Sequence, residues 1–287
     1  WPAGFASHAA EAARALRDTA DPATRQRHRE RLRRELPLDR EVLDELAGRT
    51  VDVMTVETSM IEAWELDWRP RPLLQSYAVG TARLDRLDAD WFASTEAPER
   101  LLVDLQGLDT RHPFMDAPRT WRVIFSRYEP LRRTQRWSVL ALRDSPRAVS
   151  ERPVDKLTVP LNEAVRVPRT DAGHLELRVR LEPSLLGRLC GVAWKRPEVR
   201  LLVSTTRPAV PRRIVAATAG DPFPLVFPWI DSPEGLGRLF DAPALPAPYG
   251  LSFFTAGSWA WKHVEIDFVQ VEWADGDAQP RWRNASR

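Results

Sequence analysis

The sequence is poor in cysteine and in lysine. Cys190 is the only cysteine among 287 residues, so the chain can form no internal disulfide and no cysteine-based zinc site. Lysine occurs only at Lys156, Lys195 and Lys262, and arginine supplies nearly all of the positive charge. The 42 basic residues almost balance the 40 acidic ones. A nucleic-acid surface would need local clustering of the bases, and we therefore expect no nucleic-acid partner.

The sequence also lacks long apolar runs and the common catalytic motifs. No run approaches the roughly 20 apolar residues of a membrane-spanning helix. There is no G-x-S-x-G elbow, no H-E-x-x-H, no Walker motif and no G-x-G-x-x-G after a predicted strand. We therefore expect no cofactor and no catalytic residue in this chain. It begins at Trp1 without an initiator methionine or a signal peptide, which suggests a part of a longer protein.

The period of the apolar residues predicts two regions before residue 149. Residues 1–49 are expected to form an N-terminal helical segment, which Gly48 ends. Residues 50–148 are expected to form a small, helix-covered and mainly parallel α/β domain, because strand-like and helix-like stretches alternate there. The strand candidates are Thr50–Val56, Pro72–Tyr77, Arg100–Leu105 and Arg136–Arg143. A linker is expected at Asp144–Arg152, which is rich in turn-forming residues.

Residues 149–287 are expected to form a jelly-roll-like β-sandwich, and the strand pattern described next is loosely similar to that of carbohydrate-binding modules. Apolar and charged residues alternate strictly from His174 to Glu182, as in a half-buried antiparallel strand. The other strand candidates are Val199–Thr205, Arg213–Thr218, Pro224–Phe227, Leu251–Thr255 and Val264–Trp273. Strands separated by turns rich in proline and glycine are typical of sandwiches. The predicted fold class is therefore α/β plus all-β.

A group of polar residues follows the strand predicted at Arg100–Leu105. Asp109, Arg111, His112 and Asp116 lie within eight positions beyond the carboxyl end of that strand, where open α/β sheets usually place ligand sites. Carboxylates and an imidazole could bind a divalent cation or a sugar, and Arg111 could hold a phosphate or carboxylate. The alternative is structural: Asp109 pairs with Arg111, and Asp116 caps the helix that starts near Pro118.

The predicted sandwich is rich in aromatic residues. Most of them are expected to fill its core, but Trp229, Asp231, Trp259 and Trp261 lie in stretches that are typical of loops. Exposed indole rings stack on the apolar face of a sugar ring, while neighbouring carboxylates bind its hydroxyls. These four residues are therefore candidate sugar ligands.

One further apolar stretch, Leu185–Trp194, is too short to cross a bilayer. It predicts either a helix packed over the sandwich or a segment that lies on a membrane surface. Packing over the sandwich is the favoured interpretation.

Four motifs occur in a recognisable order: P-R-P-x-x-Q-S-Y, x-L-D-x-L-D-A-x-x-F, A-P-x-x-L-L-V-D and D-x-R-x-P-x-x-D-x-P-x-T-W. Their order, from Thr50 to about Arg143, resembles the extracytoplasmic portion of large, uncharacterised bacterial multi-pass membrane proteins. Those proteins are similar in plan to glycosyltransferases that use lipid-phosphate-linked sugars. The resemblance implies an accessory part on the extracytoplasmic face of the cell membrane, joined to a membrane-embedded portion of the same polypeptide. In that plan the catalytic acid lies between membrane helices.

The expected function is therefore to bind or position a glycan or a lipid-linked sugar acceptor. Two alternatives stay open at this point. The first is a hydrolase or transferase with its site at the Asp109–Asp116 loop, which requires an open cleft there with a third acid or a metal. The second is a structural assembly domain, which requires a large apolar patch at a symmetric interface.

Overall fold

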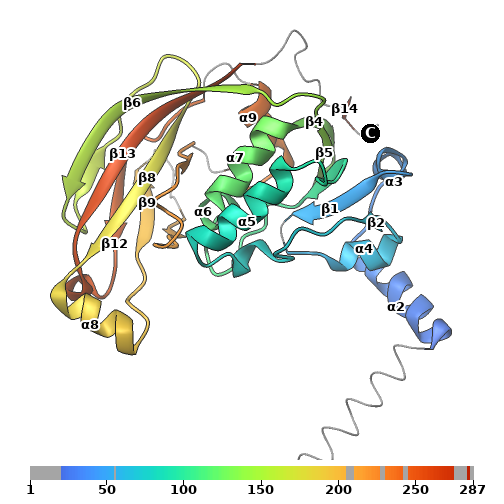
Figure 1. The fold of residues 1–287 in the computed structure, drawn as a ribbon, viewed down its shortest axis with the longest axis horizontal. Coiled ribbons are helices and arrows are strands. Elements are labelled where there is room, and N and C mark those ends of the chain that lie inside the picture. The colour runs from blue at the N-terminus through green and yellow to red at the C-terminus, as the bar shows by residue number, and fades with distance from the viewer. Residues whose placement is uncertain are drawn as a thin grey trace, which may run out of the picture.

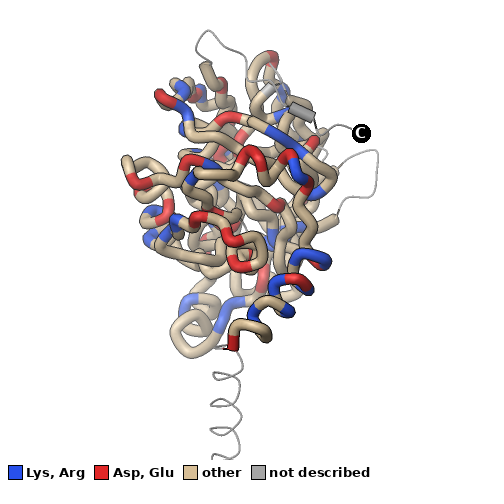
Figure 2. The backbone as a smooth tube through the Cα atoms, turned by 90° about the vertical axis from the view of Figure 1, so that its right-hand side faces the viewer, with Lys and Arg blue, Asp and Glu red and all other residues tan. Residues whose placement is uncertain are grey.

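The protein combines one mixed sheet with two antiparallel sheets (Figure 1). The computed structural model describes residues 21–54, 56–204, 210–226, 230–241, 245–274 and 283–284. Residues 1–20 of the predicted helical segment thus lie outside the described residues. Basic and acidic residues are interspersed over most of the view in Figure 2. In the described part of the chain, no helix is both long enough and apolar enough to cross a membrane.

Two helices precede the first strand, as predicted for this part of the chain. Helix α2 (Pro22–Glu35) begins after Asp21, whose carboxylate accepts a hydrogen bond from the Thr24 amide. Helix α3 (Arg40–Leu46) is short, and Gly48 follows it with φ of 67°, the left-handed conformation expected after a helix. Buried Val42 and Leu46 join α3 to the core of the sheet that follows.

The mixed sheet has the strand order β14-β4-β5-β3-β1-β2. Its strands are β1 (Thr50–Met54), β2 (Asp67–Trp68), β3 (Arg100–Val103), β4 (Tyr128–Arg133), β5 (Ser138–Leu142) and β14 (Arg283–Asn284). Strand β1 is parallel to β2 and β3, and β14 is parallel to β4, whereas β5 is antiparallel to both of its neighbours. The strands predicted near Thr50, Arg100 and Arg136 are confirmed. Strand β4 lies in a segment for which no strand was predicted.

Helices cover this sheet as the alternating pattern predicts (Figure 1). They are α4 (Ser59–Trp64), α5 (Ala82–Ala93), α6 (Pro113–Asp116) and α7 (Pro118–Arg127), with a 3-10 turn, η1 (Ser76–Ala78). Helices α5 and α7 lie side by side, and buried Asp85 of α5 accepts hydrogen bonds from the Arg119 and Thr120 amides at the start of α7. Asp85, and not Asp116, therefore caps α7, and the capping predicted for Asp116 is wrong.

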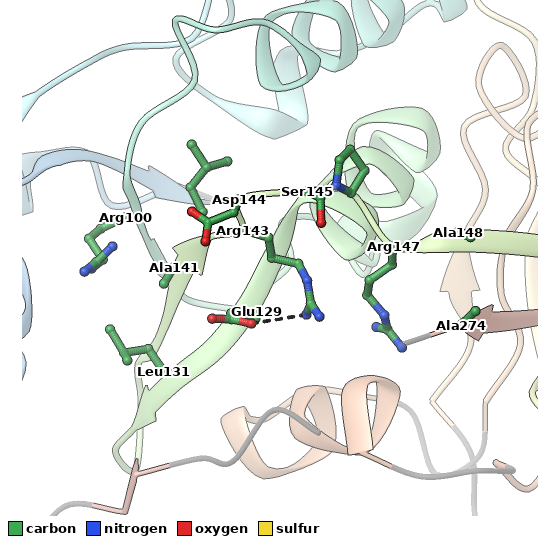
Figure 3. Close-up of a pocket in the computed structure, with 12 residues that line it drawn as sticks. Arg100, Glu129, Leu131, Ala141, Arg143, Asp144, Ser145, Arg147, Ala148 and Ala274 are labelled. Carbon is green, nitrogen blue, oxygen red and sulfur yellow. Dashed lines mark ion pairs between the residues drawn. The ribbon is translucent and has the colours of Figure 1, made fainter. Parts of the chain in front are cut away.

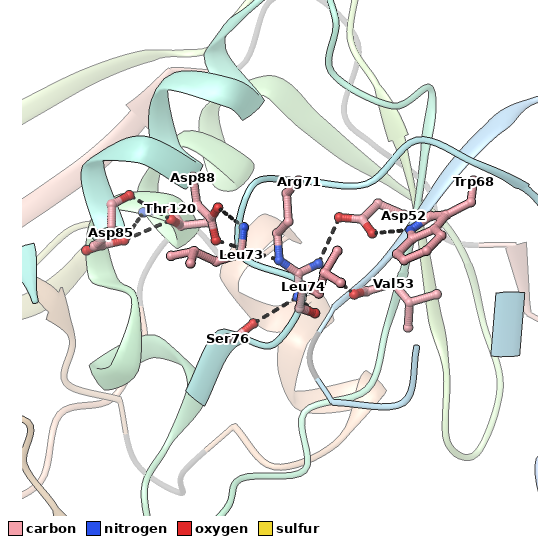
Figure 4. Close-up of polar contacts among 10 residues, drawn as sticks. All are labelled: Asp52, Val53, Trp68, Arg71, Leu73, Leu74, Ser76, Asp85, Asp88 and Thr120. Atoms are coloured by element: carbon pink, nitrogen blue, oxygen red, sulfur yellow. Dashed lines mark hydrogen bonds and ion pairs between the residues drawn. The ribbon is translucent and has the colours of Figure 1, made fainter. Parts of the chain in front are cut away.

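A buried charge network holds the segment between β2 and α5 (Figure 4). The Arg71 guanidinium, which is fully buried, donates from Nη1 to Asp52 Oδ2 at 2.8 Å and to the Val53 carbonyl at 2.7 Å. Its Nη2 donates to the Leu74 carbonyl at 2.8 Å, and its Nε lies 3.7 Å from Asp88 Oδ2. Arg71 thus links β1 to α5 through the segment that carries it.

This network explains why the strand predicted at Pro72–Tyr77 is wrong. The segment forms bends and then η1. Pro70 and Pro72 have no amide hydrogen to donate to a neighbouring strand. The Leu73 amide donates instead to Asp88 Oδ1, and the Leu74 carbonyl accepts from Arg71. Side chains thereby satisfy the backbone groups that a strand would have used.

The second part of the chain forms two antiparallel four-stranded sheets. One has the order β11-β8-β13-β6, with β6 (Ala148–Val159), β8 (His174–Pro183), β11 (Phe223–Pro224) and β13 (Trp261–Ala274). The other has the order β10-β9-β12-β7, with β7 (Ala164–Arg166), β9 (Arg200–Ser204), β10 (Arg212–Arg213) and β12 (Gly250–Phe254). The remaining elements are α8 (Leu185–Ala193), α9 (Pro233–Asp241) and a 3-10 turn, η2 (Ser258–Ala260). The linker expected at Asp144–Arg152 is wrong in its second half, where β6 begins.

The mixed sheet and the antiparallel sheets share one hydrophobic core. A single cluster of buried residues includes Phe114 and Trp121 of the first part and Phe223 and Phe268 of the second. Phe125 of α7 contacts Phe240 of α9 edge to face, with ring centroids 5.6 Å apart. The two parts are therefore packed through their interiors, and the polar loop after β3 lies where they meet.

Candidate functional site

The loop after β3 is tightly folded. Asp109 and Thr110 have φ values of 53° and 60°, which are left-handed conformations that side chains with a Cβ seldom adopt. At Gly107 a Cβ would lie 1.9 Å from the Arg111 carbonyl oxygen, so that only glycine fits. The Thr110 carbonyl accepts a hydrogen bond from the Arg213 amide, which ties the loop to β10.

Arg111 and Asp116 form a buried pair within this loop. Arg111 Nη1 lies 3.4 Å from Asp116 Oδ1 and donates to the Tyr77 carbonyl at 3.1 Å. Burial raises the pKa of Asp116 to about 7, although Arg111 and Arg213 oppose the rise. Arg111 therefore pairs with Asp116 and not, as was predicted, with Asp109. The exposed Asp109 carboxylate lies 4.0 Å from Arg213 Nη1.

His112 is buried and has a structural role in the same loop. Its Nδ1 accepts a hydrogen bond from the Phe114 amide at the start of α6. The proton of the neutral ring is therefore on Nε2, which donates to the Ile230 carbonyl at 2.9 Å. Burial lowers the pKa of His112 to about 4. Asp231, predicted as part of the aromatic group, lies here instead, with Oδ1 at 3.6 Å from His112 Nε2 and both oxygens at 2.7 Å from Arg212 Nη2.

The loop is packed at the interface between the two parts of the molecule. Arg111, His112 and Asp116 are at most 9% exposed, which leaves Asp109 and Asp231 as its accessible carboxylates. Within the described ranges, no group of three or more His, Cys, Asp or Glu side chains could hold a metal ion. The cavities described below lie elsewhere. These residues therefore have an observed role in joining the two parts, whereas ligand binding by the loop stays a prediction.

The three candidate tryptophans have different positions. Trp229 lies outside the described residues. Trp261 is the first residue of β13 and is only 8% exposed, with its indole N–H donating to the Pro197 carbonyl and Arg196 packed over its ring. Trp261 is thus a core residue and offers no free ring face, contrary to the prediction of a loop. Trp259 lies on η2 and is 53% exposed.

A cavity of about 640 Å³ lies near η2, the turn that carries Trp259. Its lining comes from the region of β9 and β12 and consists of Pro197, Glu198, Arg200, Phe254, Thr255 and Ala256. Trp259 is not among these residues, but Gly257 lies between its indole and the wall residue Pro197: a Cβ at position 257 would lie 2.3 Å from the Pro197 ring and 3.5 Å from the Trp259 indole nitrogen. The cavity thus combines a carboxylate, a guanidinium and a hydroxyl, and the exposed indole of Trp259 lies near one of its walls without lining it. The sequence does not reveal this cavity, because its walls come from residues 197–200 and 254–256, which are too far apart for any local pattern to connect.

Two other hollows were also missed. The larger, of about 700 Å³, lies where the end of β5 leads into β6, and Arg100, Glu129, Arg143 and Arg147 are among its lining residues (Figure 3). Arg143 pairs with Glu129 at 3.4 Å there, which uses part of its charge internally. The smaller, of about 360 Å³, is bordered by exposed Tyr249.

Comparison with known proteins assigns no family. No protein-family model, no curated protein and no solved structure matches the chain. The case for a function therefore depends on the geometry of these sites and on the chemistry of their residues.

Proposed function

We propose that this chain is an extracytoplasmic accessory region of a longer membrane protein, in which it binds or positions a glycan or a glycan-lipid acceptor. The observation that carries the proposal is the cavity of about 640 Å³ lined by Glu198, Arg200 and Thr255, together with exposed Trp259 near its wall residue Pro197. The partner for which the acceptor is positioned is a membrane-embedded portion of the same polypeptide. A jelly-roll-like arrangement of the two antiparallel sheets, as in carbohydrate-binding modules, belongs to the same proposal.

The chemistry of the cavity suits a sugar. A pyranose presents an apolar C–H face, which stacks on an indole such as that of Trp259. Its hydroxyls need donors and acceptors around the ring, and Glu198, Arg200 and Thr255 line the cavity with both kinds. Small-molecule sites usually have volumes of about 300–1,000 Å³, and this cavity falls within that range.

The Asp109–Asp116 loop gives less support to the alternative of a hydrolase or transferase. Such an enzyme needs an acid and a base that reach substrate in an open cleft. Asp116 and His112 are instead buried and engaged with Arg111 and the Ile230 carbonyl. Their burial favours a binding site near Trp259 over one at this loop.

The experiment is a glycan-array screen, followed by titration of the best ligand against variants. Trp259→Ala is expected to weaken binding about tenfold, because stacking contributes roughly 1 kcal/mol beyond the buried area. Glu198→Gln is expected to weaken it as well, since a charged acceptor becomes a neutral one. Tyr249→Ala is the matched control, an exposed aromatic residue at the smallest of the three hollows.

Near-ultraviolet circular dichroism should show that each variant remains folded. Equal affinity of wild type, Trp259→Ala and Trp229→Ala would refute stacking by either tryptophan. Weakening by Tyr249→Ala alone would move the site to the smaller hollow. A wild-type chain that binds no glycan on the array would refute the function itself.

A further inference from the structure

Helix α8 turns its large apolar side chains away from the protein. Its only buried residue is Gly187, whereas the large apolar residues of α8 and Trp194 after it are between 62% and 91% exposed. We define the α8 surface as Leu185, Leu186, Leu189, Val192 and Trp194 together with Trp259 of η2. These are six of the twelve exposed large hydrophobic residues in the described part of the chain. So concentrated an apolar patch indicates a contact surface.

Glycines and backbone contacts fix this orientation. A Cβ at Gly187 would lie 1.9 Å from the Ala260 carbonyl oxygen, so the helix lies directly on the backbone of η2. Ser184 caps α8 and donates from its hydroxyl to the Trp259 carbonyl at 2.6 Å. Arg196 folds back across the helix and donates to the Gly187 carbonyl at 2.9 Å. The inner face is therefore occupied, and the leucines have no partner within the described structure.

The charge around this surface is positive on balance. Residues 183–197 and 255–264 contain no aspartate or glutamate, and they contain Arg188, Lys195, Arg196 and Lys262. Glu182 and Glu198 pair with Arg188 and Lys195 from just outside these ranges. Four bases less these two acids still leave a charge of +2. Two of the three lysines of the chain thus flank α8, at its end and just after η2.

We propose that the α8 surface lies on an anionic lipid surface, with the leucines inserted among the acyl chains and the basic residues at the headgroups. A short helix with an apolar face and flanking bases is the pattern of interfacial helices. Trp194 and Trp259 add amphipathic indole rings of the kind that favour the membrane interface. Lysine and arginine near a membrane are attracted by its negative surface potential.

The shape of the molecule favours lipid over a protein partner. Figure 1 shows α8 projecting at one end of the molecule, beyond the strands that lead to it. Helix α2, with six arginines and two glutamates, lies along the same lower edge of that view but on the opposite side of the molecule, and its Arg29 and Arg33 pair with Glu62 and Glu65. One flat anionic surface could therefore meet both α8 and a second basic element. This proposal does not depend on the binding of a glycan.

The test is co-flotation of the whole 287-residue chain with vesicles. Wild type is expected to float with vesicles of phosphatidylcholine and phosphatidylglycerol, and less with phosphatidylcholine alone. The double variant Leu185→Gln, Leu189→Gln should reduce the partition coefficient at least about tenfold, since two apolar side chains no longer leave water. The double variant Lys195→Gln, Lys262→Gln should remove only the preference for phosphatidylglycerol.

The matched control is Leu74→Gln with Leu87→Gln, at two other leucines that are 46% and 49% exposed. It should float like wild type. All these leucine side chains are exposed, and glutamine suits a helix about as well as leucine at Leu87, Leu185 and Leu189, so thermal unfolding should change little. Wild type that floats with neither vesicle, or a Leu185→Gln, Leu189→Gln variant that floats like wild type, would overturn the proposal. Self-association that this variant abolishes, without flotation of wild type, would assign the surface to a second copy and overturn it too.

Discussion

Replacement of Arg71 by methionine should be among the most destabilising single substitutions in the mixed sheet. The guanidinium is fully buried between Asp52 and Asp88 and donates to two backbone carbonyls as well. Methionine has a comparable length but no charge and no donor, so it would leave two buried carboxylates without their cation. Removal of one partner of a buried ion pair costs about 3–5 kcal/mol, and we expect a loss of this size at pH 8.

The loss should depend on pH, and its sign follows from Asp88. Burial raises the pKa of Asp88 to about 6 even with Arg71 present. A rise of about two units above the ordinary value of 3.8 corresponds to a cost of about 3 kcal/mol once the carboxyl is ionised. This cost is absent below pH 3.8, grows as the pH rises toward 6, and is complete above it. Without Arg71 the pKa should rise further, so Arg71→Met should lose clearly less stability at pH 5 than at pH 8.

The assay is urea unfolding at both pH values, followed by circular dichroism. Arg69→Met is the control, because Arg69 lies two positions away but is 39% exposed and only 3.7 Å from an exposed Glu96 carboxylate. Its substitution should cost no more than about 1 kcal/mol. A loss below 1 kcal/mol for Arg71→Met at pH 8, or equal losses at pH 5 and pH 8, would refute the reasoning.

Two further substitutions should change the pH dependence of stability in opposite ways. Burial raises the pKa of Asp116 to about 7, so its ionisation removes stability between pH 3.8 and 7; Asp116→Asn should be more stable than wild type at pH 8 and similar at pH 4, as measured by urea midpoints. Burial lowers the pKa of His112 to about 4, so the stability that it contributes above pH 6.5 is lost between pH 6.5 and 4. His112→Gln should cost about 1–2 kcal/mol at pH 7 through the lost cap, and its loss relative to wild type should shrink toward pH 4; a loss that stays constant over this range would contradict the assignment of a buried neutral ring.

The sequence predicts elements well where one face of a strand or helix is buried. Strand β8 has this property, because Leu175, Leu177 and Val179 alternate with polar residues and are buried. Prediction from the apolar pattern fails for β6, whose side chains are mostly exposed along the whole strand. Strand β6 exists because eleven of its residues pair with β13, and such pairing leaves no mark in the local apolar pattern.

The same distinction holds for the candidate site. Its position after β3 follows from the order of strands and helices, which can be read from the sequence. The residues that bind its side chains cannot be read from the sequence in this way. Arg213, Ile230 and Asp231 follow the loop by about 100 residues or more. Only the packing of the second part against the first turns His112 from a candidate ligand into a buried cap. The cavity near Trp259 was missed for the same reason.

Helix α8 shows how a single contact decides which side chains of an apolar helix are exposed. Leu185–Trp194 is equally apolar whether it packs inward or faces outward, and composition cannot separate the two. The structure separates them through Gly187, which lies against η2 and leaves the leucines outside. Because η2 also carries Trp259, a glycan held at that residue would lie next to the proposed lipid surface. An acceptor could then have its sugar near Trp259 and its lipid in the bilayer, and the two proposals can still fail separately, since one is tested by soluble glycans and the other by vesicles.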